Sequence, residues 1–446
     1  MAHLSDHFTY RKIFRMTIAP ILMMIFTSLY VVVDGLFIAN FVGKDAYAGE
    51  NLIFPIIMII GGIGFMFGTG GSALSAKLLG EGKKEEANQV FSMLLVFTFL
   101  VGIIVSIGGY FLVETFAHGM ASITEDATDE MVKEAITYGK ILIIGQAIFM
   151  LQNYFQSFLL VDERSRLGFI ATLCAGIGNI ILDFLFIVVF KLGVAGAALG
   201  TISGYFVGAI IPFIHFIKNK NGLIEFKLTR FKARPILKSC FNGSSEFVNN
   251  ISSSIVGIVF NIQLLKFMGQ NGVAAYGTIA YVSFLFVSIF IGYSIGMAPV
   301  ISFNYGAENH DELKNVLRKS LIIIFIMELF MVLISFTCAR PLAMLFSSGN
   351  NDLEELTINA LRICSLAFIF TGIGIFTSSF FTALNNGALS ALNAFMRTLV
   401  FQIAFILLLP LIFGASGIWW AIIFADCAAF ILAIACLIWK RKQYHY

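Results

Sequence analysis

Long apolar runs separated by short polar stretches form the dominant pattern of this chain. A run of about 20 apolar residues is enough for one helix to cross a bilayer, and longer runs indicate tilt or extension past the membrane. The pattern predicts an all-α integral membrane protein with about twelve transmembrane helices. The predicted spans are residues 14–41, 51–79, 89–114, 136–161, 167–190, 195–217, 238–267, 273–304, 315–337, 356–384, 389–412 and 416–439.

The chain also contains an internal repeat. Moving the first half forward by 226 residues, from 41 to 267, places Phe41-Val42-Gly43 on Phe267-Met268-Gly269. A shift of 221, from 193 to 414, places Gly193-Val194-Ala195-Gly196 on Gly414-Ala415-Ser416-Gly417. Each half has an even number of predicted spans, so both halves enter the membrane from the same side. The repeats should therefore be parallel and related by an axis along the membrane normal.

This repeat predicts two pseudo-twofold-related six-helix bundles with a binding site between them. The N-lobe is expected over residues 1–217 and the C-lobe over residues 238–446. Between them, residues 218–237 form a polar, basic stretch that we interpret as a cytoplasmic linker. Pro235 and the turn-prone Asn219-Lys220-Asn221-Gly222 mark this linker, which is also a reasonable hinge.

Composition and charge narrow the class further. The chain is 59% hydrophobic and 12% charged, whereas soluble proteins carry about 25% charged residues. A net charge of +3, scattered along the chain, gives no reason to expect a nucleic-acid partner. Lys and Arg concentrate on one side of the alternating spans, which predicts a multi-pass protein of the cytoplasmic membrane with both termini in the cytoplasm. The basic linker could instead bind anionic lipid headgroups.

Carboxylates inside the apolar runs are the first candidates for function. A charged side chain at the centre of a membrane helix costs about 2.5–3.5 kcal/mol on insertion scales, so it should face a partner or water. Asp34 lies in the first span, Asn179 and Asp183 share one face of the fifth, and Thr201 lies in the sixth. This oxygen-rich set suits a hard cation such as Na⁺, and it equally suits a proton. The alternative is a hydrogen-bonded cluster that only locks helices together.

The flanks of this fifth-span face are Gly176 and Gly178, which we expect to permit close helix approach. Further polar and polarisable positions could line a substrate cavity, although ordinary helix packing explains several of them equally well. These candidates are Glu246, Tyr30, Gln146, Asn153, Gln156, Asn250, Tyr281 and Met297. Of these, Glu246 and Asn250 belong to a polar face of the seventh span, where Glu246 could be a second coupling acid.

Three single charges in apolar runs, Glu328, Arg397 and Asp426, are expected to form structural ion pairs or hydrogen bonds. The chain shows no nucleophile–base or metal-ligand constellation, so we do not expect an enzyme. The glycine-rich second span lacks the Lys-Ser/Thr ending of a phosphate loop, and no other nucleotide motif is present. We expect no cofactor and no obligate protein partner, and uphill transport would have to use an ion gradient. A passive channel is the alternative from another class.

Several motifs together resemble the multidrug and toxic compound extrusion (MATE) family over essentially the whole chain. They are Pro20 with Asp34, the turn Gly43-Lys44-Asp45-Ala46, the run from Gly178 to Asp183, the run from Leu192 to Ala198, the run from Val273 to Gly277, and the run from Pro299 to Ala307. The resemblance implies twelve helices in two lobes. It also implies antiport of amphipathic, often cationic, small-molecule drugs against H⁺ or Na⁺. A lipid-linked oligosaccharide flippase of the same superfamily is the alternative, with a cavity richer in Arg and Lys.

The resemblance is greatest to the DinF-like branch. It implies that the N-lobe cation site is made by Asp34, Asn179, Asp183 and Thr201. It further implies that Tyr30, Asn153 and Gln156 line the adjacent cavity. Glu246 is similar to the seventh-helix glutamate of NorM-like members. Those members also use a tenth-helix aspartate, which the tenth predicted span lacks, so the coupling site is expected in the N-lobe.

Overall fold

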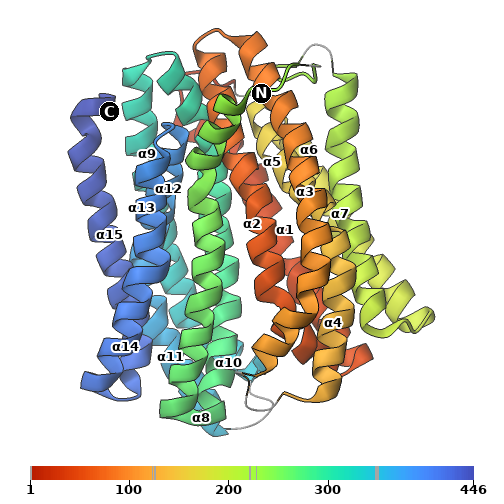
Figure 1. Ribbon diagram of the computed structural model, residues 1–446. Helices are drawn as coiled ribbons and strands as arrows, with labels where there is room; N and C mark the ends of the chain where they lie inside the picture. The colour runs from red at the N-terminus through yellow and green to blue at the C-terminus, as the bar shows by residue number, and fades with distance from the viewer. Residues whose placement is uncertain (1–2, 123, 125–126, 220–221, 228, 347–350) are drawn as a thin grey trace.

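The computed structural model describes residues 3–122, 124, 127–219, 222–227, 229–346 and 351–446, and its regular structure there is helical. The first half contains α1 (Tyr10–Phe37), α2 (Lys44–Gly80), α3 (Lys84–Ala121), α4 (Asp129–Ile144), α5 (Gln146–Val161), α6 (Ser165–Asp183) and α7 (Gly193–Lys218). The second half contains α8 (Ala233–Gly306), α9 (His310–Thr337), α10 (Ala339–Phe346), α11 (Asn351–Ser365), α12 (Phe368–Ala383), α13 (Gly387–Phe395), α14 (Phe401–Phe413) and α15 (Ser416–Tyr444). We call α1–α7 the N-lobe and α8–α15 the C-lobe. Figure 1 shows them side by side, with both termini at one end of the bundle, here called the terminal end.

Twelve membrane crossings follow from these helices. In the described part of the chain, nine helices are long and apolar enough to cross a membrane, and two bent helix pairs bring the number to eleven. The twelfth comes from α8, whose 74 residues would extend roughly 110 Å if straight. Its helix is broken at Gly269 (φ 64°), and its two ends, at Ser239 and Phe303, both approach the last part of α2. The chain therefore reverses at Gly269, as the two predicted spans 238–267 and 273–304 require.

Two predicted spans are bent. The span expected over residues 136–161 is divided at Gly145 into α4 and α5, which are bent by 54°. A side chain at Gly145 would collide with Ile202 of α7, so glycine permits this close approach at the bend. The span expected over residues 356–384 is divided into α11 and α12, bent by 50°. Hydropathy alone does not reveal such bends.

The repeat read from the sequence is visible in the backbone. Eight of the ten described residues with positive φ fall in repeat-related pairs: Gly43 and Gly269, Gly82 and Glu308, Glu163 and Asn385, and Gly193 and Gly414. Left-handed backbone is uncommon outside glycine, so its recurrence at matching places in both halves is strong support for the repeat. This confirms the predicted pair of pseudo-twofold-related bundles.

Glycines bring the lobes into close contact near the terminal end. A Cβ on Gly80 of α2 would collide with the Phe303 carbonyl of α8, and one on Gly306 would collide with the Lys77 carbonyl. The contact is reciprocal, because 80 and 306, like 77 and 303, differ by 226 residues. At the other end of the bundle the hydroxyls of Tyr47 and Tyr281 form a 2.7 Å hydrogen bond. The lobes are thus packed backbone to backbone at the terminal end.

The N-terminal segment connects the two lobes at this same end. Glu163, between α5 and α6, accepts hydrogen bonds from the His3 ring and the Leu4 amide, both at 2.7 Å. Glu312 of α9 binds the His7 ring at 2.7 Å and accepts the Phe8 amide at 2.8 Å. Preceding α1, residues 3–8 therefore join an N-lobe loop to a C-lobe helix, a contact that hydropathy does not predict.

Of the linker expected over residues 218–237, residues 219–232 lie between α7, which ends at Lys218, and α8, which begins at Ala233, whereas residues 233–237, with Pro235, form the start of α8. Residues 220, 221 and 228 of the expected linker lie outside the described part of the chain. The described part contacts the N-lobe, because the amide of Glu225 donates to Asn88 at 2.9 Å and that of Lys227 donates to Ser92 at 2.8 Å. The lobe boundaries at 217 and 238 stay a prediction.

Candidate functional site

Three helices of the N-lobe bring together the acids that stood out in the sequence. The Thr201 hydroxyl of α7 donates to Asp34 Oδ2 of α1 at 3.1 Å. The carboxyl group of Asp183, the last residue of α6, lies within electrostatic range of the Asp34 carboxyl group. Asp34 is 6% exposed and Asp183 is 0% exposed. Two carboxyl groups thus share one buried position.

Glycines allow the helices to come this close. A Cβ on Gly200 of α7 would collide with Asp183 Oδ1, and one on Gly204 would lie 3.1 Å from Asn179 Cβ. On the other side of α6, a Cβ on Gly176 would lie 3.2 Å from the Tyr30 ring. At Gly178 the nearest atom, on a valine of α7, would be 4.0 Å away. Of the two glycines expected to permit close approach, only Gly176 therefore lies at a tight contact.

The buried acids have spare hydrogen-bonding capacity. Among the described residues, no hydrogen-bond partner is present for Asp34 Oδ1, for both carboxylate oxygens of Asp183, or for the amide O and N of Asn179. No Lys, Arg or His in the same described part forms an ion pair with Asp34 or Asp183. Buried carboxylates without partners are costly. This arrangement can accept a proton or a small cation, which would neutralise the charge.

The backbone is also irregular directly after both acids. A π-helical segment, Ile38–Val42, begins four residues after Asp34, and a second, Phe184–Val189, begins immediately after Asp183. π-Helical turns are rare and occur frequently at functional sites, since they interrupt the regular ladder of backbone hydrogen bonds. The two acids therefore lie where α1 and the α6 helix both depart from regular geometry.

Sequence reasoning missed a third acid, Glu50 of α2. It is 8% exposed, accepts a long 3.5 Å hydrogen bond from the Tyr138 hydroxyl, and leaves its other oxygen without a partner. It lies within electrostatic range of Asp34 and Asp183. The second span was predicted to begin at residue 51, which put Glu50 outside the membrane. Because α2 begins at Lys44, Glu50 lies more than one turn inside the helix.

Other predicted lining residues of the N-lobe surround this cluster with different roles. Tyr30 packs on α6 through Gly176 and lies within electrostatic range of Asp34. Gln156 donates to the Thr172 hydroxyl at 3.0 Å and ties α5 to α6. The fully buried Gln146 begins α5 at the bend and has no described hydrogen-bond partner for its amide, and the Asn153 amide nitrogen lacks one also.

The predicted C-lobe residues lie apart from Asp34 and Asp183, although Tyr281 is within electrostatic range of Glu50. Asn250 donates to the Glu246 carbonyl at 2.8 Å and packs against Gly62 of α2, at the lobe interface. Tyr281 binds Tyr47 at the end of the bundle away from the termini. Met297 is 0% exposed and lies in the C-lobe core. The structure therefore brings together Asp34, Asp183, Thr201, Asn179 and Tyr30. The four C-lobe residues Glu246, Asn250, Tyr281 and Met297 are not part of that group.

The C-lobe has its own buried polar cluster. Asp426 of α15 accepts hydrogen bonds from the Thr371 hydroxyl at 2.5 Å and the Gln402 amide at 3.2 Å. Arg397 donates to Asn249 at 3.3 Å and lies within electrostatic range of Asp426 and Glu246. Glu328 accepts the amide of Ile373 at 2.9 Å. The three single charges are held by hydrogen bonds, and no ion pair within 4.0 Å links them in the described chain.

Comparison with known proteins decides the family. The model of the MatE family matches residues 20–185 and 247–408, well over half of the 446 residues. The chain belongs to the MatE family. Curated relatives of this MATE protein include the multidrug export protein MepA of Staphylococcus saprophyticus, 26% identical over 430 residues that cover 94% of this chain and 92% of MepA. MepA of Staphylococcus aureus strain MSSA476 is 25% identical over 433 residues, covering 94% and 93%.

Solved MATE structures have the same fold. A MATE crystal structure in complex with MaL6 superposes with a TM-score of 0.91 at 24% identity, covering 98% of this chain and 97% of that one. An outward-facing multidrug resistance MATE transporter of the MOP superfamily superposes with a TM-score of 0.89 at 25% identity, covering 97% and 95%. The predicted fold is therefore confirmed, and this MATE protein is a membrane transporter rather than an enzyme.

Proposed function

We propose that this MATE transporter exports amphipathic, often cationic, compounds across the cytoplasmic membrane by antiport against H⁺ or Na⁺. The observation that carries the proposal is the group of buried N-lobe acids, Asp34, Asp183 and Glu50, none of which forms an ion pair with a described basic residue. Ionisable groups at membrane depth commonly mark ion pathways. The relatives named multidrug export proteins support the substrate class.

The proposed cycle depends on the charge of this acid group. A cation or proton on Asp34 and Asp183 removes the cost of the unpaired carboxylates and lets α1, α6 and α7 settle together. Export follows if the loaded and empty states differ in their affinity for the drug, because a ligand shifts an equilibrium only by its differential affinity. Each charge moving inward contributes ~2.3 kcal/mol per 100 mV of membrane potential.

The direction of transport depends on topology, for which we propose that the terminal end faces the cytoplasm. Basic residues collect at this end, as positive-inside topology requires. They include Arg11, Arg15, Lys77, Lys83, Lys84, Arg164, Arg166, Lys314, Arg318 and Arg441. Packing of the lobes at this end, with residues 3–8 across it, then closes the cytoplasmic side. The acidic site, with its lack of basic partners, disfavours the flippase alternative, which would need to bind a pyrophosphate.

The test uses the full chain in proteoliposomes, with ethidium as the organic cation and a pH gradient or a Na⁺ gradient imposed separately. We expect one gradient to drive ethidium accumulation and Asp34→Asn to reduce it at least about tenfold, because the coupling charge is lost. Asp311→Asn, at an exposed carboxylate in the first turn of α9, is the matched control and should transport normally. The proposal is overturned if Asp34→Asn retains gradient-driven transport. It is also overturned if neither the pH gradient nor the Na⁺ gradient drives ethidium accumulation in the wild type.

A further inference from the structure

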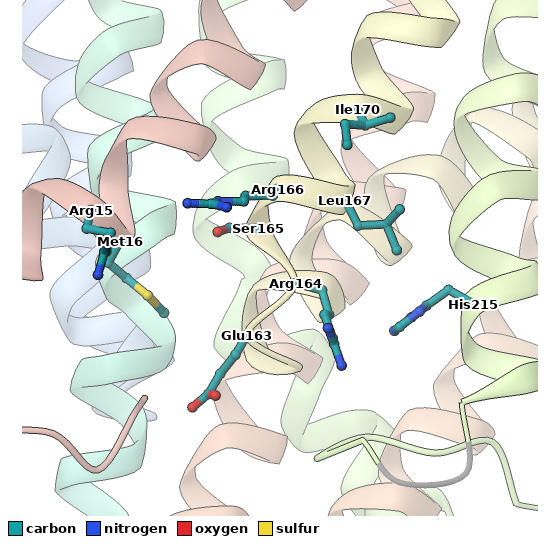
Figure 2. A pocket seen from close by; sticks show the side chains of 9 residues that line it. All are labelled: Arg15, Met16, Glu163, Arg164, Ser165, Arg166, Leu167, Ile170 and His215. Atoms are coloured by element: carbon teal, nitrogen blue, oxygen red, sulfur yellow. The ribbon is translucent and has the colours of Figure 1, made fainter. Parts of the chain in front are cut away.

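A cavity of about 490 Å³ lies at the terminal end, away from the acid site. Figure 2 shows three arginines around it, Arg15 from α1 and Arg164 and Arg166 at the start of α6, with the Arg166 side chain extending toward Arg15. Residues far apart in the sequence thus place three positive charges around one hollow. Like charges brought together repel one another unless an anion lies between them.

These arginines are not neutralised by the described protein. Across the described ranges, no acidic side chain forms an ion pair with Arg15, Arg164 or Arg166, and no side-chain hydrogen bond engages their guanidinium groups. Glu163 lines the same cavity, but it is occupied by His3 and Leu4 of the N-terminal segment. Guanidinium groups bind phosphate oxygens in forked geometry. The hollow therefore fits a phosphate group.

The rest of the wall is apolar and leads along the outside of α6. Leu167 and Ile170 line the cavity, and Ile170 is 50% exposed. Ile177 and Ile181, seven and eleven residues further along α6, lie on the same helix face and are 50% and 59% exposed. A free phosphate ion would make no contact with this apolar face of α6, whereas the acyl chains of a lipid bound by its phosphate would cover it.

We propose that this cavity binds the phosphate of an anionic phospholipid, with the acyl chains lying against the isoleucine face of α6. Its assignment to the cytoplasmic leaflet rests on the topology in the proposed function. Basic pockets between transmembrane helices on the cytoplasmic side bind anionic headgroups in this way. The cavity shares Glu163 with the N-terminal segment, so the lipid would lie beside the contact that joins the lobes.

Native mass spectrometry of the purified full-length protein tests this directly, with phosphatidylglycerol, phosphatidylcholine or inorganic phosphate added at equal concentration. We expect one tightly held phosphatidylglycerol, weaker phosphatidylcholine, and no displacement by phosphate at that concentration. The triple change Arg15→Gln, Arg164→Gln and Arg166→Gln should weaken phosphatidylglycerol binding, by about fivefold for each arginine removed. If the triple variant does not fold, the double variant with Arg15→Gln and Arg166→Gln, which retains Arg164, replaces it in the test.

The matched control removes the same charge elsewhere at the terminal end, at Lys314, Arg318 and Lys442, each exposed and changed to Gln. It should bind phosphatidylglycerol as the wild type does. Equal loss in control and triple variant would mean a general surface-charge effect and overturn the site, as would undiminished binding by the triple variant. Full competition by inorganic phosphate would assign the cavity to free phosphate and overturn the lipid. Because the readout is binding, it stands apart from the transport test of the proposed function.

Discussion

Asp426 of the C-lobe and the acid pair of the N-lobe are buried in opposite ways. In the C-lobe, Asp426 has two side-chain donors, Thr371 and Gln402, and lies within electrostatic range of Arg397. In the N-lobe, Asp183 has no described hydrogen-bond partner on either oxygen, and Asp34 has one on only one of its two. A repeated fold has thus produced one buried acid with donors on both oxygens, Asp426, and one buried pair with few partners. Glu328 of the C-lobe is intermediate, because it accepts one backbone amide and its other oxygen has no described partner.

The difference separates structure from function in physical terms. A buried charge with donors and a nearby cation holds helices together, and removing one partner costs stability. A buried acid left without partners contributes little to stability and persists where function requires it. The comparison therefore predicts that transport depends mainly on Asp34 and Asp183, whereas Asp426 contributes mainly to stability.

The test with the largest expected effect substitutes one acid in each lobe. We expect Asp183→Asn to reduce gradient-driven transport at least about tenfold without lowering the free energy of unfolding, because an uncompensated buried charge is removed. Asp426→Ala should lower the free energy of unfolding by about 1–2 kcal/mol, because it removes two hydrogen bonds, and should retain transport. Proteoliposome transport and chemical unfolding in detergent measure the two effects. If Asp183→Asn destabilises the protein more than Asp426→Ala does, the contrast between the lobes is wrong.

A smaller change tests whether the geometry of the acids matters as well as their charge. Gly200→Ala would place a methyl group against Asp183 Oδ1 and displace that carboxyl group from Asp34. We expect transport to fall about three- to tenfold, because a displaced group loses its orientation toward the cation. Transport assays over a range of cation concentrations measure this as a loss of apparent affinity.

Gly178→Ala is the matched control for Gly200→Ala, since a Cβ there would meet nothing closer than 4.0 Å. It should transport as the wild type does, and its free energy of unfolding should be unchanged or slightly raised, because alanine favours helix over glycine. Equal effects of the two substitutions would indicate that any added methyl group disturbs the N-lobe, which would break the link to Asp183.

Much of this organisation could be predicted from the sequence, because in a membrane protein the apolar runs mark the crossings and a polar residue within a run is conspicuous. The apolar runs predicted the crossings, and a shift of 226 residues predicted the repeat that Gly80 and Gly306 display in reciprocal contact. Asp34 and Asp183 stood out because a carboxylate in an apolar run has few structural explanations. Their role in coupling stays a prediction, although the structure places them together.

The features that could not be predicted from the sequence depend on three-dimensional contacts or on exact helix ends. Hydropathy could not show that α4 and α5 bend at Gly145, or that Gly145 permits close approach to Ile202 of α7 there, because that approach is visible only in three dimensions. Nor could it show that residues 3–8 reach Glu312, more than 300 positions away. Glu50 was missed because the second span was predicted to begin one residue later, and helix ends predicted from hydropathy are uncertain by several residues.

Glu50 also supplies the last and smallest test of the comparison. Glu50→Gln keeps the side-chain shape and its contact with the Tyr138 hydroxyl but removes a negative charge within electrostatic range of Asp34 and Asp183. We expect the apparent affinity for the coupling cation to fall about fivefold, equivalent to ~1 kcal/mol, because one attractive charge is lost. Tyr138→Phe removes the long hydrogen bond and retains the charge, so its effect should be smaller. Were Glu50→Gln to transport like the wild type at every cation concentration, Glu50 would be a structural acid of the kind found in the C-lobe, and the lobes would differ less than their contacts indicate.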